Sequence, residues 1–127
     1  MTGADWANAL LLTIDSDGPQ YNACVNMARM ALWKGHERET HVNGTLTLDE
    51  AVLFTCADAM KEHYEKLLDD PAPRTKDFYG RDVLTESQRL LIAQIVGYAV
   101  AEVDWHVLAR HYLDKLKEWG ERATAGL

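Results

Sequence analysis

Residues 104–120 read DWHVLARHYLDKLKEWG, and this stretch is the most clearly amphipathic part of the chain. Its apolar side chains recur three and four residues apart, which is the spacing of one face of an α-helix. Asp104 is of a residue type that caps helix N-termini, and Gly120 is of the type that ends helices. The stretch predicts a helix over 105–119 with one face in a core. That face comprises Trp105, Leu108, Ala109, Tyr112, Leu113, Leu116 and Trp119.

The same periodicity predicts further helices over about 3–14, 19–34 and 48–69. It predicts one more that starts at the capping box of residues 85–88 and ends at about residue 103. Three of them start at a capping box, in which a threonine hydroxyl and a side chain three residues later accept orphan amide protons. The capping boxes are Thr2–Asp5, Thr47–Glu50 and Thr85–Gln88.

The stretch 13–21, TIDSDGPQY, separates the first two of these helices and could be the start of a calcium loop. A calcium loop needs a glycine at its sixth place and a glutamate at its twelfth. Counted from Asp15, those places hold glutamine and asparagine, so the stretch is not a calcium loop. A helix break explains it better, with Gly18 as the N-cap and Pro19 as the first helical residue.

Residues 35–47 are harder to assign. Asn43-Gly44 is a strong signal for a two-residue hairpin, but the flanking strands would be only two or three residues long. A very short hairpin near Asn43-Gly44 and a simple loop both stay open. We therefore expect an all-α protein, a compact bundle of about five helices, forming a single helical domain over residues 1–127.

Composition limits the classes of function. The 127 residues carry a net charge of -7, which argues against direct binding to duplex nucleic acid. The apolar runs are too short to span a bilayer, and the first residues do not form a secretory signal. The two cysteines, Cys24 and Cys56, lie within apolar helical patterns. A reduced, buried pair fits a cytoplasmic protein without a membrane partner.

The sequence shows no pattern for catalysis or for a cofactor. It has no phosphate loop, dinucleotide fingerprint or nucleophile elbow. Glu102 and His106 are four residues apart, as are Glu37 and His41, but neither pair belongs to a set that closes four metal positions. We therefore expect no catalytic residue, no metal and no cofactor. A metal-dependent enzyme using Glu102 and His106 stays an alternative.

The loop over 71–82 is the candidate partner-binding segment because it combines three basic residues with two aromatic ones. Arginine and aromatic side chains are typical anchors of protein interfaces, and they also bind single-stranded nucleic acid. Whether the aromatic side chains are exposed or fold back onto the core stays open. The candidate partner-binding residues are Arg74, Lys76, Phe78, Tyr79 and Arg81.

Ala93, Gly97 and Ala101 lie at strict four-residue spacing in the helix that follows this loop. Glycine lowers helix stability, so Gly97 here suggests that another backbone packs closely. That backbone could belong to the same chain or to a second subunit of a homo-oligomer.

Two stretches, DWANALLLTIDSDGPQYNA (5–23) and VDWHVLARHYLDKL (103–116), resemble small uncharacterised accessory proteins carried by phages and other bacterial mobile elements. The resemblance implies an inhibitor of host defence or a modulator of a host enzyme. Together with the lack of a catalytic pattern, the net negative charge and the loop over 71–82, it leads us to expect a non-enzymatic protein in the cytoplasm of a bacterial host cell. It would inhibit a host defence protein, such as a defence nuclease or a CRISPR effector, by occluding its surface. The alternative is an oligomeric sponge for a small nucleotide signal, with Arg74, Lys76 and Tyr79 on the ligand.

Overall fold

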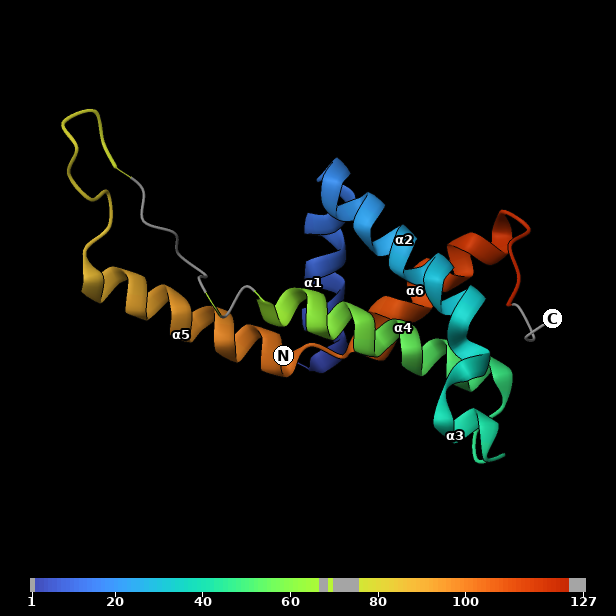
Figure 1. Ribbon diagram of the computed structural model, residues 1–127. Helices are drawn as coiled ribbons and strands as arrows, with labels where there is room; N and C mark the ends of the chain where they lie inside the picture. The colour runs from blue at the N-terminus through green and yellow to red at the C-terminus, as the bar shows by residue number, and fades with distance from the viewer. Residues whose placement is uncertain (1, 67–68, 70–75, 124–127) are drawn as a thin grey trace.

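The computed structural model describes residues 2–66, 69 and 76–123 of the chain. It confirms the all-α prediction (Figure 1), and the five expected helices are present with bounds close to those expected. They are α1 (Gly3–Asp15), α2 (Gly18–Lys34), α4 (Leu48–Glu65), α5 (Glu86–Glu102) and α6 (Trp105–Glu118). A 3-10 helix, η1 (Gly35–Glu37), and the single-turn α3 (Glu39–Val42) join α2 to α4.

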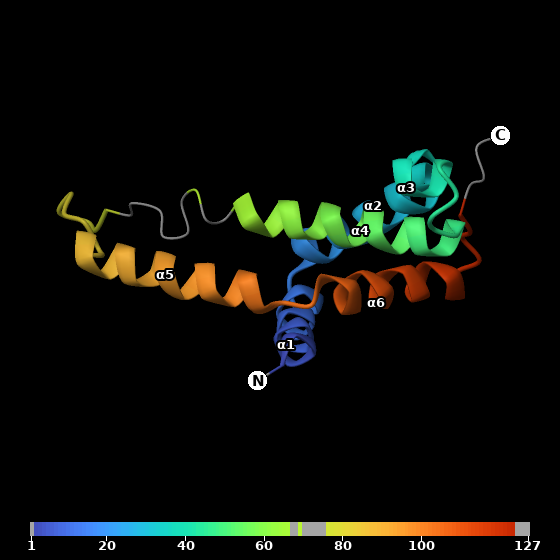
Figure 2. The same cartoon turned by 90° about the horizontal axis from the view of Figure 1, so that it is seen from below.

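Helix α6 lies at the centre of the core. Leu108, Tyr112 and Leu116 are fully buried, and the helix packs against α1, α2 and α4. Figure 2 shows α4 and α6 running side by side, while α1 crosses their direction steeply in Figure 1. The apolar face expected for residues 105–119 is therefore the face that three other helices cover.

Helix ends follow the expected caps. All three capping boxes form, and the Asp104 carboxylate accepts from the first amides of α6. At the other end of α6, Gly120 adopts a φ of +86°. The Glu121 N–H donates to the Leu116 carbonyl and the Gly120 N–H to that of Lys117, which is a Schellman motif.

The N-cap expected for the second helix was wrong by one residue. Asp17 is the N-cap of α2, because its carboxylate accepts from the Gln20 N–H at 3.2 Å. Gly18 is already helical, and Pro19 follows it in the first turn, where no amide partner is needed. The helix break itself is confirmed.

The hairpin alternative near Asn43-Gly44 is wrong. The residues before it form α3, and the Asn43 side-chain oxygen accepts from both the N–H and the hydroxyl of Thr45, at 3.0 and 2.6 Å. This Asx turn, with Gly44 at a φ of +83°, leads directly to the N-cap of α4. The segment joins two helices, so its flanks are not strands.

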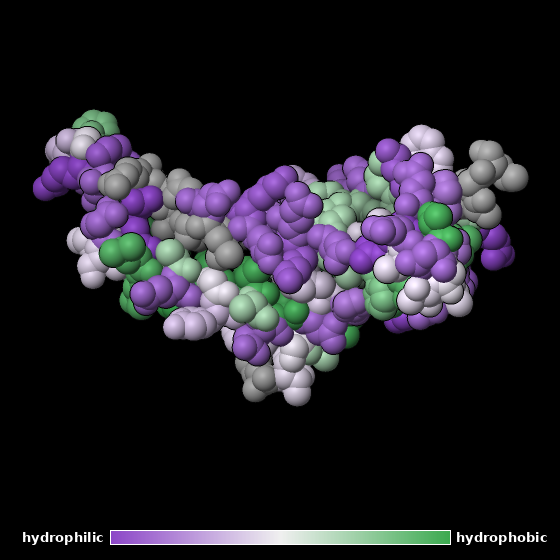
Figure 3. Space-filling view, turned by 60° about the horizontal axis from the view of Figure 1, so that its bottom comes forward, coloured by the Kyte–Doolittle hydropathy of each residue, from purple (hydrophilic) through white to green (hydrophobic). Residues whose placement is uncertain are grey.

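Helix α5 lies outside the core that the other four long helices share. It contributes no fully buried residue, although Val100 near its C-terminal end packs against the core, and its described contacts with other helices are with α1 and α4. Figures 1 and 2 show it extending away from the body, and hydrophobic patches lie over it in Figure 3. Its C-terminal end is held where the Asp104 N–H donates to the Gly3 carbonyl at 2.9 Å.

In the described part of the chain, no single helix is long and apolar enough to cross a membrane. Helices α5 and α6 meet that criterion of length and composition only as a pair, with a bend of 67° between them.

Gly35, the C-cap of α2, packs directly against Val52 of α4. A Cβ atom at Gly35 would lie 2.7 Å from Val52 Cγ2 and 3.0 Å from Val52 Cα. The backbone of Gly35 has an ordinary helical φ of -57°, so space, not conformation, requires glycine here.

We predict that Gly35→Ala lowers the free energy of unfolding by roughly 1–3 kcal/mol, because α2 and α4 must move apart. Gly18→Ala is the matched control, since no atom lies within 4 Å of the added methyl group. It should be neutral or slightly stabilising. Urea denaturation followed by circular dichroism measures both variants. Equal stability of the two would show that the contact with Val52 imposes no constraint.

Candidate functional site

Residues 76–82, which we call the tip turn, form a tight hairpin-like turn. Lys76 and Asp82 make an antiparallel bridge, and the Asp77 N–H donates to the Arg81 carbonyl at 2.8 Å. The Gly80 N–H donates to the Asp77 carbonyl at 3.0 Å, and Gly80 has a φ of +77°. This is the pattern of a three-residue loop with glycine in the left-handed region. The spacing of aspartate and glycine in DFYG is a signal for this turn that the sequence analysis missed.

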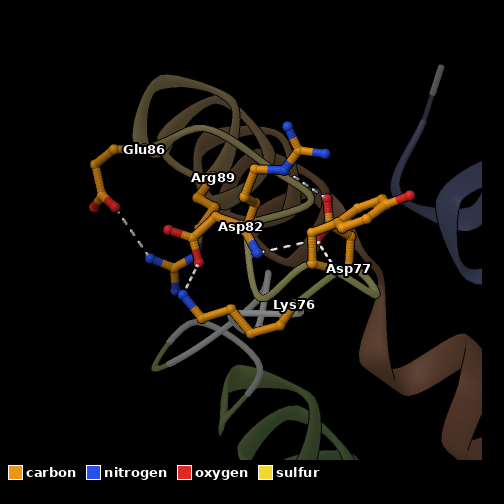
Figure 4. Close-up of polar contacts among 7 residues, drawn as sticks. Lys76, Asp77, Asp82, Glu86 and Arg89 are labelled. Atoms are coloured by element: carbon orange, nitrogen blue, oxygen red, sulfur yellow. Dashed lines mark hydrogen bonds and ion pairs between the residues drawn. The ribbon is translucent and has the colours of Figure 1, made fainter.

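The Asp77 carboxylate fixes the backbone of the tip turn. Its Oδ1 accepts from the N–H groups of Tyr79 and Arg81 at 2.9 and 3.0 Å. Its Oδ2 lies 3.4 Å from Arg81 Nε, and these contacts surround Asp77 in Figure 4. Because one side chain satisfies two amides of the loop, the residues between them are held in one conformation.

The two aromatic side chains of the tip turn are exposed. Phe78 is 97% exposed and Tyr79 is 75% exposed, so neither folds back onto the core. The rings meet edge to face, with centroids 5.5 Å apart, and the Arg81 guanidinium lies 5.1 Å from the Tyr79 centroid. The turn therefore presents a small aromatic surface that is bordered by a cation.

The cations of the tip turn are balanced within it. Lys76 Nζ lies 2.6 Å from Asp82 Oδ1, and Arg81 pairs with Asp77 (Figure 4). The two cations and two carboxylates of residues 76–82 leave no net charge. A phosphate backbone is bound through excess positive charge, which these seven residues do not have. Their chemistry suits an apolar pocket on a protein better than a nucleic acid.

The structure brings together four of the five predicted partner-binding residues. Lys76, Phe78, Tyr79 and Arg81 share the tip turn, and Figure 1 places this turn beside the end of α5 that lies farthest from the core. Arg74 lies outside the described residues. We call the tip turn and α5 together the arm.

The predicted packing residues Ala93, Gly97 and Ala101 all lie on α5. Ala93 and Gly97 are partly buried, whereas Ala101 is exposed. Whether the packing partner of these residues belongs to the same chain or to a second one stays a prediction.

The most exposed apolar side chains of α5 were missed as candidates. Leu90, Leu91, Ile95 and Tyr98 are between 57% and 75% exposed. Leu91, Ile95 and Tyr98 follow one another at four- and three-residue spacing, so they form one stripe of the helix. The sequence could have indicated this apolar stripe, because Gln94 is the one strongly polar residue among residues 90–101.

Neither of the two pairs that were considered as metal ligands shares one helical face. Glu102 ends α5 and His106 lies in α6, where its ring packs against Phe54 with centroids 5.0 Å apart. Glu37 belongs to η1, and His41 Nδ1 lies 2.8 Å from the Leu46 carbonyl oxygen. The described residues contain no group of three or more side chains suited to a metal ion.

A groove of about 190 Å³ between the end of α2, the start of α4 and the end of α6 is lined by both signs of charge. Its charged residues are Asp49, Arg110, Asp114, Lys117, Glu121 and Arg122. Acids and bases are equal in number, so the lining favours no class of charged ligand.

A buried polar network lies behind the turn between α1 and α2. The Tyr112 hydroxyl donates to Asp15 Oδ1 at 2.9 Å, and the Tyr64 hydroxyl donates to Gln20 Oε1 at 3.1 Å. Cys24 Sγ lies 3.4 Å from the Tyr64 hydroxyl. Burial raises the pKa of both tyrosines, and their hydrogen bonds raise it further. These groups stay protonated and stabilise the core.

The thiols are equally unreactive. Burial raises the pKa of Cys24, and it raises the pKa of Cys56 to about 12. A nucleophilic cysteine needs a lowered pKa and access to solvent, and both thiols are fully buried.

We predict that Tyr112 makes stability fall at alkaline pH. Its pKa in the folded state lies above the value of about 10 in the unfolded state. Its contribution is therefore complete below about pH 10 and is lost as the pH rises further, because only the unfolded tyrosine ionises there. Tyr112→Phe should lower the free energy of unfolding by about 1 kcal/mol at pH 7 and weaken its dependence on pH above 10. Urea denaturation from pH 7 to 11 tests this, and equal slopes for both proteins would contradict it.

Comparison of the chain with protein-family models, with curated proteins and with solved structures finds no match in any of the three.

Proposed function

We propose that this is a non-enzymatic binding protein that occludes the surface of a protein partner through the tip turn. The observation that carries the proposal is the exposure of Phe78 and Tyr79 on a turn that Asp77 fixes. Exposed aromatic side chains gain most from insertion into a partner pocket, and they are common hot spots of interfaces. A fixed loop loses little conformational entropy when it binds.

The charges of the molecule support a protein partner with a basic surface. The ion pairs at Lys76 and Arg81 leave the tip turn neutral, while the chain as a whole carries -7. A net negative charge steers association toward a positive surface. Proteins that bind nucleic acid have such surfaces, because they must neutralise phosphates.

The resemblance to mobile-element accessory proteins supplies the class of partner. We propose a host defence protein in the bacterial cytoplasm, such as a defence nuclease or a CRISPR effector. Its nucleic-acid channel would be both basic and open to occlusion. In this proposal the tip turn binds the partner, and the body formed by α1, α2, α4 and α6 blocks access to its surface.

We predict that tagged full-length protein captures one protein from lysate of a bacterial host, and that Phe78→Ala/Tyr79→Ala abolishes the capture. Each truncation of a hot-spot aromatic side chain should weaken the complex by at least about 30-fold. Trp33→Ala is the matched control, since Trp33 is an aromatic residue that is 59% exposed on α2. Titration with the recovered partner would measure the affinities of all three proteins.

Two results would contradict this function. One is the absence of any captured protein at low and high salt. The other is a partner that binds the Phe78→Ala/Tyr79→Ala variant as tightly as it binds the wild type. Circular dichroism provides the folding check, because neither side chain contributes to the core.

A further inference from the structure

We propose that the chain forms a two-fold homodimer through α5, with the stripe Leu91, Ile95 and Tyr98 packed against the same stripe of a second copy. The two helices run antiparallel and cross at Ile95. This inference stands on α5 alone and does not depend on the proposed function of the tip turn.

Helix α5 exposes a large apolar surface. Leu90, Leu91, Ile95 and Tyr98 together expose on the order of 500 Å², at about 100 Å² for each half-exposed aliphatic side chain and under 200 Å² for tyrosine. This equals the largest apolar patch that a monomer usually exposes. Stable dimers bury about 800 Å² on each partner. The side chains that border the stripe are also exposed and would add to the buried area: Ser87, Gln94, Ala101 and Glu102.

The composition of α5 is that of a permanent interface. Residues 90–101 contain no charged side chain. Interfaces between partners that fold separately are about as polar as the rest of a protein surface, whereas the centre of a permanent homodimer interface is apolar and depleted in charge. The α5 stripe has the apolar, uncharged composition of a permanent homodimer interface. The tip turn, with its four charged residues, has the more polar composition of an interface between separately folded partners. The two parts of the arm therefore suit different partners.

The residues of α5 are also arranged symmetrically about Ile95. Gln88 and Glu102 each lie seven residues from Ile95, so both lie on its face of the helix at the two ends of the stripe. An antiparallel crossing at Ile95 places Gln88 of one copy opposite Glu102 of the other, twice. The side-chain oxygen of Gln88, Oε1, already accepts from the Thr85 N–H at 2.8 Å. The N–H groups of the Gln88 side-chain amide are therefore left to donate to the Glu102 carboxylate of the other copy. The same crossing places Leu91 beside Tyr98 of the second copy. The stripe is thus complementary to itself, as a two-fold interface requires.

Analytical ultracentrifugation of the full chain tests the proposal. We expect a mass of twice the 14.3 kDa of the chain. Ile95→Lys places two like charges across the two-fold axis and should weaken the dimer by at least about 100-fold. Leu12→Lys is the matched control, because Leu12 is an aliphatic residue that is 74% exposed on α1. It should leave the dimer unchanged.

Crosslinking provides a readout that does not rely on a destabilised interface. Ile95→Cys places one thiol of each copy at the crossing point, so a short bis-maleimide should join the two chains. Leu12→Cys should not be joined. The native thiols of Cys24 and Cys56 are fully buried and do not compete.

Three outcomes would overturn the proposal. A monomeric mass at every accessible concentration would remove the dimer. A dimer that survives Ile95→Lys and is not crosslinked through Ile95→Cys would place the interface elsewhere. A monomer that floats with phosphatidylcholine vesicles, and loses this binding on Ile95→Lys, would show that the stripe faces lipid. Each outcome is read without the tip turn, so Phe78→Ala/Tyr79→Ala should dimerise like the wild type.

Discussion

Burial of one face of α6 against three other helices is the interaction on which the body depends. Leu108, Tyr112 and Leu116 are each removed from water completely, and each such side chain contributes about 1.5–3 kcal/mol. The helices of the body can pack closely because small alanine side chains line their contacts, and these alanines are almost entirely buried. The alanines are Ala7, Ala28, Ala31, Ala51, Ala57 and Ala109. Tyr112 also orients α6 relative to α1, because its hydroxyl donates to Asp15 at the end of α1.

Local features of the chain could be predicted because they depend on residues close in sequence. Capping boxes and apolar periodicity place the ends of five helices within a few residues. The errors arose where two local solutions compete. Asp17 and Gly18 are both good N-caps, and the hydrogen bond to Gln20 decides between them. Asn43-Gly44 predicts a hairpin only where strands flank it, and here Asn43 binds Thr45 instead.

The candidate site divides in the same way. The tip turn could be found from its residues because Lys76, Phe78, Tyr79 and Arg81 are contiguous with their acidic partners. The exposure of Phe78 and Tyr79 could not be predicted from these residues, because it depends on the path of α5. That path depends on contacts with residues far away in sequence. The Gly3 carbonyl accepts from the Asp104 N–H, and a Cβ at Gly3 would lie 2.9 Å from the Glu102 carbonyl oxygen. This contact joins the start of α1 to the link between α5 and α6, about 100 residues away in sequence, and it holds the C-terminal end of α5.

A helix outside the core needs a source of stability. Most of the stability of a protein helix comes from packing of its apolar face, and a capping box at Thr85 contributes only about 1 kcal/mol. The proposed second copy would supply the missing burial and stiffen the arm at the same time. An antiparallel pair would hold the N-terminal ends of the two α5 helices about 25–30 Å apart, because Ile95 lies nine residues from the start of α5 and a helix rises 1.5 Å per residue. The two aromatic surfaces would then face opposite ends of the dimer, so that each engages its own partner molecule. In this arrangement the uncharged stripe of α5 determines where the tip turn is presented, and the tip turn determines what it binds.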